Sequence, residues 1–273
     1  MSPQRLHATY TGIADALSAD SPPVLLWGSA SAHVCLGQSQ SAACELAPDI
    51  DVPVVQRPLG GGTVWIDENQ FVYALIEPLH LAPRYPADWS DWALPPAIAT
   101  FRRFGLGVEQ HDRDLWLRGR KIAGTGAATI GGSAVFASSF LMRFPRQRFA
   151  ACIAGSAEFR RWLDAGLAAT MTDWSEHASV CVEVELRSAF CDAVSRTMNW
   201  QLSPSVLSAG ESSAIDAVEL DAHDDDSGSR HRVHRDGIKL NADSHLVERT
   251  ENGVCIRELV VRGAVSRRAV VMV

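Results

Sequence analysis

Apolar and polar positions alternate along this chain with two periods, one typical of helices and one typical of strands. Residues 5–18 place apolar side chains at helical spacing and predict an opening helix. Two short apolar runs, 24–27 and 33–36, are joined by Gly and Ser and predict a hairpin or a pair of strands. Residues 95–104 predict a further helix, closed by two glycines. The other predicted strands are 52–55, 63–66, 71–76, 107–110, 114–124 with a turn at 118–120, and 133–144.

The pattern changes to helical spacing from about residue 156. Ser156 is a suitable N-cap, and the apolar residues that follow it recur on one helical face. Residues 183–200 predict a second amphipathic helix. Polar residues dominate 203–236, which predicts a linker. The rest of the chain alternates like a small antiparallel sheet, with Glu251-Asn252-Gly253 as a hairpin turn.

These elements predict an α+β fold, in which a mixed β-sheet flanked by helices is followed by a small C-terminal accessory domain. The predicted boundaries are 1–202 for the large catalytic domain, 203–236 for the linker and 237–273 for the accessory domain. A chain of 273 residues that is 47% hydrophobic and 21% charged has an ordinary globular composition and is long enough for this arrangement.

Charge, apolar run length and cysteine spacing exclude several classes of protein. A net charge of −7 argues against a general nucleic-acid-binding protein, which would need a basic surface. No apolar run approaches the roughly 18 residues that span a bilayer, and the first residues lack the apolar core of a secretory signal. We therefore expect a cytoplasmic protein with no membrane partner. The six cysteines include no Cys-x-x-Cys pair, which argues against a zinc knuckle or a disulfide framework.

Three consecutive glycines, Gly60, Gly61 and Gly62, stand just before the strand predicted at 63–66. Glycine has no Cβ, so successive amides there can point the same way and a ligand can approach the main chain closely. Arg57, just upstream, would offer a fixed positive charge to an anionic group. A glycine-rich hairpin turn with no ligand explains the same residues, and the three glycines alone do not decide between the two.

Lysine occurs only twice among the 25 basic residues, as Lys121 and Lys239. Lys121 lies in a predicted strand between apolar Leu117 and Ile122, and an ammonium suits a phosphate or carboxylate oxygen. A surface lysine that extends its charge into water is the alternative. Gly124 and Gly126 again leave main chain exposed beyond the lysine.

Together these segments resemble the lipoate-protein ligase family, which is related to biotin protein ligases and octanoyltransferases. That family has an arginine and a glycine run before an apolar strand with an aspartate, as Arg57, the three glycines and Asp67 stand here. A later segment has a lysine followed by small residues, which is similar to Lys121-Ile122-Ala123-Gly124-Thr125-Gly126. Leu36-Gly37-Gln38-Ser39-Gln40 looks like the end of an earlier strand of the family, and 237–273 resembles its accessory domain.

The resemblance is incomplete at three places. Gln56 stands where the family has a second arginine, and Ile66 stands where it has a histidine. The usual His-His-Gly after the lysine strand is replaced by Phe136-Ala137-Ser138. Acyltransferase relatives also vary at these positions, so the motif by itself does not establish ligase activity.

The resemblance implies that lipoate is activated with ATP and Mg²⁺ to lipoyl-AMP, and that the lipoyl group then passes to a lysine of an acceptor protein. It assigns catalysis to Lys121, which would neutralise the phosphate and polarise the acyl carbonyl. Val64 and Trp65 would line an apolar tunnel for the lipoyl tail. The acceptor would be a lipoyl domain, a glycine-cleavage H protein or a lipoate-binding carrier. The implied substrate and ATP contacts are Arg57, Gly60, Gly61, Gly62, Thr63, Val64, Asp67, Gly124 and Thr125.

Two other functions stay open at this point. Cys152 lies 31 residues after Lys121, close to where one branch of transferases that need no ATP carries its nucleophile, although a buried, inert cysteine explains it too. A lipoate-binding protein without catalysis is the other alternative. His231 and His234, with the acidic run 224–226, are a candidate metal site in the polar stretch, but a solvated charge run is the simpler interpretation. We assign no ligands for a metal.

Overall fold

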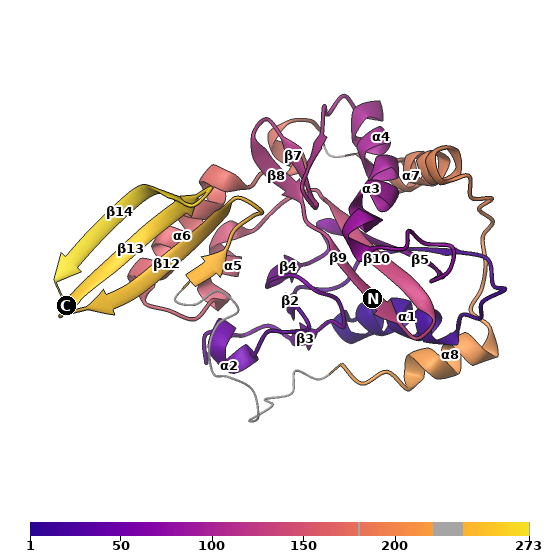
Figure 1. The fold of residues 1–273 in the computed structure, drawn as a ribbon, viewed down its shortest axis with the longest axis horizontal. Coiled ribbons are helices and arrows are strands. Elements are labelled where there is room, and N and C mark those ends of the chain that lie inside the picture. Colours follow the sequence, from indigo (N-terminus) through magenta and orange to yellow (C-terminus); the bar gives the residue numbers. More distant parts are fainter. Residues whose placement is uncertain (180, 221–236, 273) are drawn as a thin grey trace.

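The computed structural model describes residues 1–179, 181–220 and 237–272 as an α+β arrangement of several sheets and helices (Figure 1). The α+β prediction is confirmed. The helices are α1 Pro3–Ala16, α2 Ala42–Glu45, η1 Pro86–Asp88, α3 Trp89–Ala93, α4 Pro95–Arg103, α5 Arg146–Cys152, α6 Ala157–Thr170, η2 Trp174–Glu176, α7 Glu183–Met198 and α8 Ala209–Asp216. The strands are β1 Val24–Gly28, β2 His33–Leu36, β3 Val54–Gln56, β4 Val64–Ile66, β5 Gln70–Pro78, β6 Glu109–His111, β7 Asp114–Leu117, β8 Arg120–Ala123, β9 Gly126–Ile130, β10 Ser133–Leu141, β11 Gly237–Lys239, β12 Ser244–Glu251, β13 Val254–Val261 and β14 Ala264–Met272.

The central sheet has the order β1-β5-β10-β9, and all of its strands are antiparallel. Both faces of this sheet are covered. Successive residues of a strand point to opposite faces, so neighbouring residues of one strand pack in different clusters. On β5, Tyr73 and Leu75 pack in the cluster that includes Phe101 of α4 and Phe190 of α7. The intervening residues of β5 pack against α1. This double burial explains why β5 reads as an almost continuous apolar run.

Two smaller sheets lie beside the central one. One has the order β3-β2-β4, in which β2 and β3 are parallel, and the other is the antiparallel meander β6-β7-β8. The predicted pairing of 24–27 with 33–36 is wrong, since β1 pairs with β5 while β2 pairs with β3 and β4. Met1 binds the connection between β1 and β2: its amino group donates to Ser29 O at 2.9 Å and its carbonyl accepts from Ser31 N. The bound connection leads from one sheet to the other.

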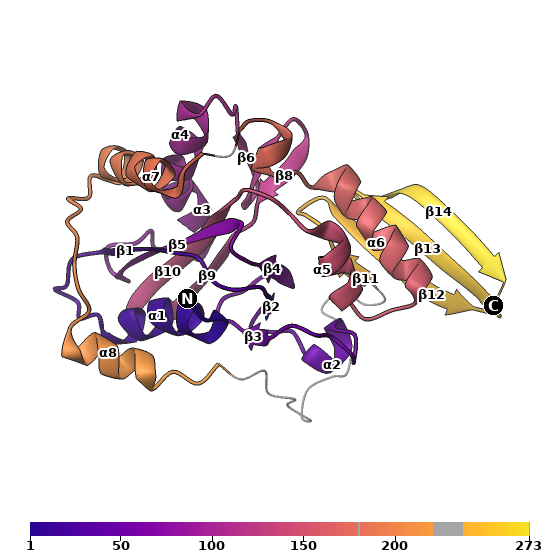
Figure 2. The same ribbon diagram turned by 180° about the vertical axis from the view of Figure 1, so that it is seen from behind.

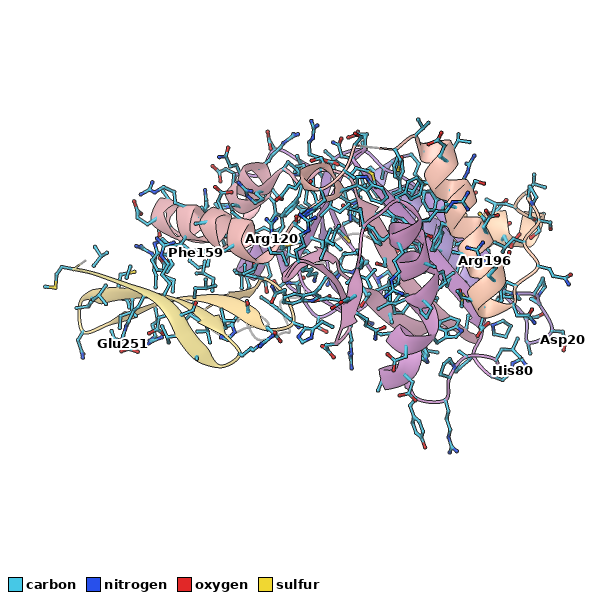
Figure 3. All side chains as sticks on the ribbon, turned by 90° about the horizontal axis from the view of Figure 1, so that it is seen from above. Asp20, His80, Arg120, Phe159, Arg196 and Glu251 are labelled. Carbon is cyan, nitrogen blue, oxygen red and sulfur yellow. The ribbon has the colours of Figure 1, made fainter. Side chains whose placement is uncertain are left out.

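The last four strands form an antiparallel sheet of order β11-β12-β13-β14, called the C-terminal sheet below. It lies with α5 and α6 at one end of the molecule, away from α4 and α7 (Figures 1 and 2). Leu240 and Leu246 pack against Leu163 and Leu167 of α6 in one buried cluster. Phe159, at the start of α6, is fully buried in the same cluster (Figure 3). The predicted cap is confirmed, because Ser156 Oγ accepts from Phe159 N at 3.0 Å.

The predicted linker contains regular structure. Residues 209–216 form α8, whose start carries a capping box between Ser208 and Glu211. Ile215 is buried against α1, so closely that a Cβ on Gly12 would lie 2.5 Å from the main chain of Ile215. The candidate metal residues His231 and His234 lie outside the described residues, and the domain boundaries stay a prediction. No helix in the described ranges is long and apolar enough to cross a membrane.

A chain of hydrogen bonds fastens α1 to β2 through two buried histidines. His33 Nδ1 lies 2.8 Å from the carbonyl of Ser31, which can only accept, so this nitrogen carries a proton. In the neutral ring the His33 Nε2 is then an acceptor, and His7 Nε2 donates to it across 3.1 Å. His7 Nδ1 is in turn an acceptor, and the Tyr10 hydroxyl donates to it at 3.0 Å. Each hydrogen bond of this network therefore has one donor and one acceptor only while both imidazole rings are neutral.

Burial keeps both rings neutral, and acid should therefore unfold the protein. Burial, with a smaller contribution from Arg57, lowers the pKa of His7 to about 3, and burial also lowers the pKa of His33 to about 4. Their ordinary pKa of about 6.5 returns on unfolding. The stability that the two neutral rings contribute to the fold is therefore complete above that pH and is lost as the pH falls towards 4. Two protons taken up on unfolding correspond to a slope of roughly 2.7 kcal/mol per pH unit.

Urea unfolding measured from pH 7 to pH 4.5 tests this expectation. His7→Gln retains an acceptor for Tyr10 and a donor for His33 but does not titrate, so its slope should be smaller by about 1.4 kcal/mol per pH unit. Equal slopes for the variant and the wild type would show that this pair does not control acid unfolding.

Candidate active site

The glycine run lies in a loop, here called the glycine loop (residues 57–63), between β3 and β4. Arg57 is 7% exposed, and its guanidinium binds the glycine loop from the side of the protein interior. Nη2 donates to Gly60 O at 3.1 Å and to Gly62 O at 2.8 Å, while Nη1 donates to Cys35 O at 3.2 Å. Arg57 therefore holds the carbonyls of the loop inward, and its permanent charge lies beneath the loop instead of on an open surface.

Fixing the carbonyls leaves the amides for another partner. Gly61 has a φ of +105°, a region that suits glycine. The N–H groups of Gly61 and Gly62 make no hydrogen bond within the ranges that the structure describes. Exposed amides above a buried guanidinium form a site that favours negative charge. The interpretation as a hairpin turn is wrong, because β3 and β4 both pair with β2 and not with each other, and the ligand site stays a prediction.

A second loop, residues 37–40, supports the first. Gln40 accepts from Gly37 N at 2.9 Å and donates to Thr63 Oγ1 at 2.9 Å. Gln56 donates to carbonyls of this loop, including Gln40 O at 2.8 Å. A Cβ on Gly37 would lie 2.0 Å from Gly61 O, so only glycine allows this approach. The family's second arginine is thus replaced by a glutamine that holds a loop.

Lys121 lies on β8, and its amine pairs with a carboxylate on the neighbouring strand. Nζ is 3.0 Å from Asp114 Oδ1, and the two side chains are only 17% and 10% exposed. Leu115 and Leu117, the alternate residues of β7, point into the core. Asp114 therefore belongs to the opposite face of the hairpin, the face that presents Lys121. A snorkelling lysine would extend into water, whereas this one is held close to the sheet.

The connection from β8 to β9 brings the lysine and the glycine loop together. Gly60 N donates to Ala127 O at 3.4 Å, and a Cβ on Gly126 would lie 3.3 Å from Gly60 O. At the other end, a Cβ on Gly124 would lie 2.9 Å from Lys121 Nζ. Thr125 lies between them, with its hydroxyl bonded to Arg113 O at 2.8 Å. The 124–126 segment therefore lies next to Lys121 at one end and next to the glycine loop at the other.

Three other predicted contacts have different surroundings. The Asp67 carboxylate accepts from Trp65 Nε1 at 2.8 Å and from Asn69 N at 2.8 Å, so it is used inside the protein. The Trp65 ring is 3% exposed and packs in the buried cluster that includes residues of α5 and α6. Val64 is 37% exposed next to the glycine loop. Ile66, which replaces the family's histidine, is buried.

Cys152 has the properties of a core residue. It ends α5 with 4% exposure, and its thiol donates to Arg148 O, four residues earlier in the helix, at 3.4 Å. Burial, with a smaller contribution from Asp51, raises the pKa of this thiol. A cysteine nucleophile must form a thiolate readily, and this environment disfavours the thiolate.

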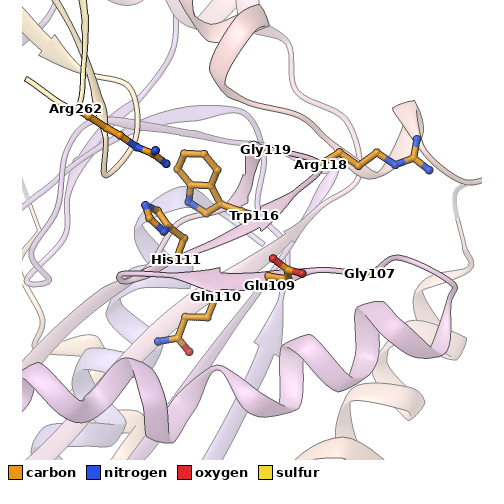
Figure 4. Close-up of a pocket in the computed structure, with 8 residues that line it drawn as sticks. All are labelled: Gly107, Glu109, Gln110, His111, Trp116, Arg118, Gly119 and Arg262. Carbon is orange, nitrogen blue, oxygen red and sulfur yellow. The ribbon is translucent and has the colours of Figure 1, made fainter. Parts of the chain in front are cut away.

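Two further features bear on ligands. Among the described residues, no three His, Cys, Asp or Glu side chains come together as a metal site. A hollow also lies at the seam between the β6–β7 hairpin and the C-terminal sheet, and no residue of the glycine loop lines it (Figure 4). Its lining residues are Gly107, Glu109, Gln110, His111, Trp116, Arg118, Gly119 and Arg262.

The comparison with protein families decides the relationship. The model of the lipoyl protein ligase A/B catalytic domain matches residues 8–195. The chain belongs to this family. The match covers every residue of the site just described and most of the described structure before the C-terminal sheet. Comparison with curated protein sequences gives no match.

Solved structures of lipoate-protein ligases share the fold of this family member. The bipartite lipoate protein ligase of Thermoplasma acidophilum, studied with its E2 lipoyl domain, has a TM-score of 0.72 at 17% identity, over 79% of this chain and 87% of that chain. A T. acidophilum structure with bound lipoic acid has a TM-score of 0.65 at 16% identity, over 79% and 89%. Lipoate-protein ligase A bound with ATP has a TM-score of 0.65 at 17% identity, over 78% and 87%.

Sequence reasoning missed Asp114 as the partner of Lys121. The signal was present, because the turn at 118–120 fixes the register of the hairpin, and in that register Trp116 pairs with Lys121. Asp114, two residues before Trp116, shares its face. What the pattern cannot show is that the aspartate reaches along the strand to the amine.

Proposed function

We propose that this family member is a lipoate-protein ligase, which activates lipoate with ATP to lipoyl-AMP and transfers the lipoyl group to a lysine of an acceptor protein. One observation carries the proposal: a positioned amine, Lys121, and unpaired loop amides lie on either side of the 124–126 segment. Lipoate carboxylate, ATP and the acyl phosphate that they form are all anionic at the reacting centre. The site supplies one full and several partial positive charges there.

The chemistry follows from these charges. A carboxylate oxygen of lipoate attacks the α-phosphorus of ATP, the bond to the β-phosphate oxygen breaks, and pyrophosphate leaves. Lys121 would neutralise the charge that builds on the α-phosphate oxygens, and the amides of Gly61 and Gly62 would bind the acyl phosphate. The acceptor amine then attacks the acyl carbonyl, AMP leaves with the electron pair of the C–O bond, and the nitrogen loses a proton. The protein needs no nucleophile of its own, only positioning.

Mg²⁺ fits this scheme as an ion that enters with the nucleotide. The described residues offer no cluster of three ligating side chains, and the Asp114 carboxylate is engaged by Lys121. Mg²⁺ keeps several waters and binds phosphate oxygens readily, so ATP can supply most of its ligands. The ion would reduce the charge of the phosphates while Lys121 and the glycine loop orient them.

The proposed acceptor is a lipoyl domain, as in the archaeal relative whose structure was studied with its E2 lipoyl domain. A glycine-cleavage H protein and a lipoate-binding carrier are the other candidate acceptors. The proposed location is the cytoplasm.

An acylation assay tests the proposal against the transferase alternative. We expect the acceptor to gain one lipoyl mass only with lipoate and Mg-ATP together, with one pyrophosphate released per acceptor modified. Cys152→Ser should leave this rate within about twofold of wild type, since the thiol is buried and protonated. Acylation from an acylated donor protein without ATP, abolished by Cys152→Ser, would establish the transferase instead. Binding of lipoate without any turnover would indicate a non-catalytic protein.

A further inference from the structure

Lys121 is held at two places, and both supports lead to the C-terminal sheet. The side chain is held by Asp114, at 3.0 Å. The main chain is held by the segment that follows α6, since Lys121 O accepts from Thr172 N at 2.8 Å and Lys121 forms a bridge with Met171. The position of the amine therefore depends on a carboxylate and on the end of a helix.

The turn between β11 and β12, residues 241–243, contacts both supports. Ala242 N donates to Asp114 Oδ2 at 3.2 Å, so this carboxylate binds Lys121 with one oxygen and the turn with the other. Asn241, which is 2% exposed, donates from Nδ2 to Thr170 O at 3.2 Å, at the end of α6.

Asp243 links this turn to β6 and to the neighbouring turn of the C-terminal sheet. Asp243 Oδ2 is 3.1 Å from His111 Nε2 on β6 and accepts from Arg262 Nε at 2.8 Å. Arg262 N also donates to Asp243 O at 2.7 Å, which joins the β13–β14 turn to the same place. Figure 4 shows the side chains of Arg262 and His111 converging beside Trp116 at this seam.

We propose that the 241–243 turn positions the catalytic amine: its amide fixes the Asp114 carboxylate, and that carboxylate fixes Lys121 beside Gly124. Asp114 and Ala242 are then positioning residues. The inference rests on the proposed function for its kinetic consequence, but its geometric consequence can be measured without turnover.

Ala242→Pro is the direct variant, because proline removes the only N–H that the turn donates to Asp114. Its matched control is Ala242→Gly, which retains that N–H. Should proline prevent folding, Asp243→Ala loosens the turn by removing its contacts with His111 and Arg262. Arg268→Gln is the control for that change, since it breaks the Arg268–Glu258 ion pair elsewhere in the same sheet.

The exposure of Lys121 is the first readout. The chain has only two lysines, so limited acetylation followed by peptide mass spectrometry compares Lys121 with exposed Lys239 in the same molecule. We expect the labelling rate of Lys121, relative to Lys239, to rise at least about threefold in Ala242→Pro and in Asp243→Ala. Both control variants should match the wild type.

The kinetic readout separates positioning from binding. Loss of a hydrogen bond to a charged group predicts a fall of at least about tenfold in kcat for lipoate-dependent pyrophosphate release in Ala242→Pro, with KM for lipoate within about twofold. If the wild type releases no pyrophosphate, the proposed function fails while the labelling comparison still stands. Unchanged labelling of Lys121 in both Ala242→Pro and Asp243→Ala would overturn the positioning role.

Discussion

Lys121→Ala should reduce lipoate-dependent pyrophosphate release by at least about a hundredfold, because one preorganised charge at the reacting phosphate is removed. The Lys121 side chain is 17% exposed and its amine is already paired with Asp114, so its position is fixed before substrate arrives. Removing it would also leave the Asp114 carboxylate facing the phosphates, and this repulsion adds to the loss. The measurement is a continuous pyrophosphate assay at saturating lipoate and Mg-ATP.

The matched control is Lys239→Ala, which removes the only other lysine of the chain. Lys239 is exposed on β11, and its removal should leave the rate within about twofold. A variant Lys121→Ala that retained more than a tenth of the wild-type rate would contradict the proposed role of this amine.

Gly37→Ala should reduce activity by displacing the glycine loop, although Gly37 is not itself a predicted substrate contact. The added Cβ would lie 2.0 Å from the carbonyl oxygen of Gly61, so the glycine loop must move by an ångström or more. Overpacking of this kind costs about 1–3 kcal/mol of stability, and a displacement of about 1 Å can lower the rate about a hundredfold. We expect a lower melting temperature together with an activity loss of that size.

Gly62→Ala is the stability control for this change. A Cβ on Gly62 meets no atom within 4 Å, and its backbone is not in the left-handed region. Its melting temperature should stay close to that of the wild type, as measured by thermal unfolding of both variants. If Gly37→Ala kept both the melting temperature and the activity of wild type, the close approach of the two loops would be wrong.

The sequence could predict what depends on near neighbours. The N-cap at Ser156 and the left-handed turn at Asn252 and Gly253 were predictable because capping and turn chemistry act within a few residues. The pairing of β1 with β5 could not be predicted, since β2, β3 and β4 lie between them in the sequence and an apolar run does not identify its partner strand. The helix α8 was hidden in a polar stretch because only Ile215 is buried from it.

The candidate site shows the same division. The residue types of the glycine loop and of the lysine strand predicted a site for an anion, and in the structure both segments contact residues 124–127. The partners of each side chain were not predictable. Arg57 binds carbonyls of its own loop and Asp67 binds the indole of Trp65, two residues away, but residue types alone do not show these side-chain orientations. Cys152 lies in a core that segments distant in the sequence assemble.

The replacement of the family's histidine by Ile66 also has a physical explanation. Ile66 is 5% exposed and packs in a small cluster with Leu6 and Val72, so this position supports the core here. In the proposed function, the amine of Lys121 and the loop amides bind the anion without an imidazole. The ligase assignment therefore depends on those two elements binding the same phosphate.

NMR of protein labelled at lysine Cε tests that central claim most directly, because the chain contributes only two lysine signals. On addition of a non-hydrolysable sulfamate analogue of lipoyl-AMP, we predict a large shift of the Lys121 signal and none of the Lys239 signal. Tight binding of the analogue with both signals unmoved would show that the amine does not face the acyl phosphate.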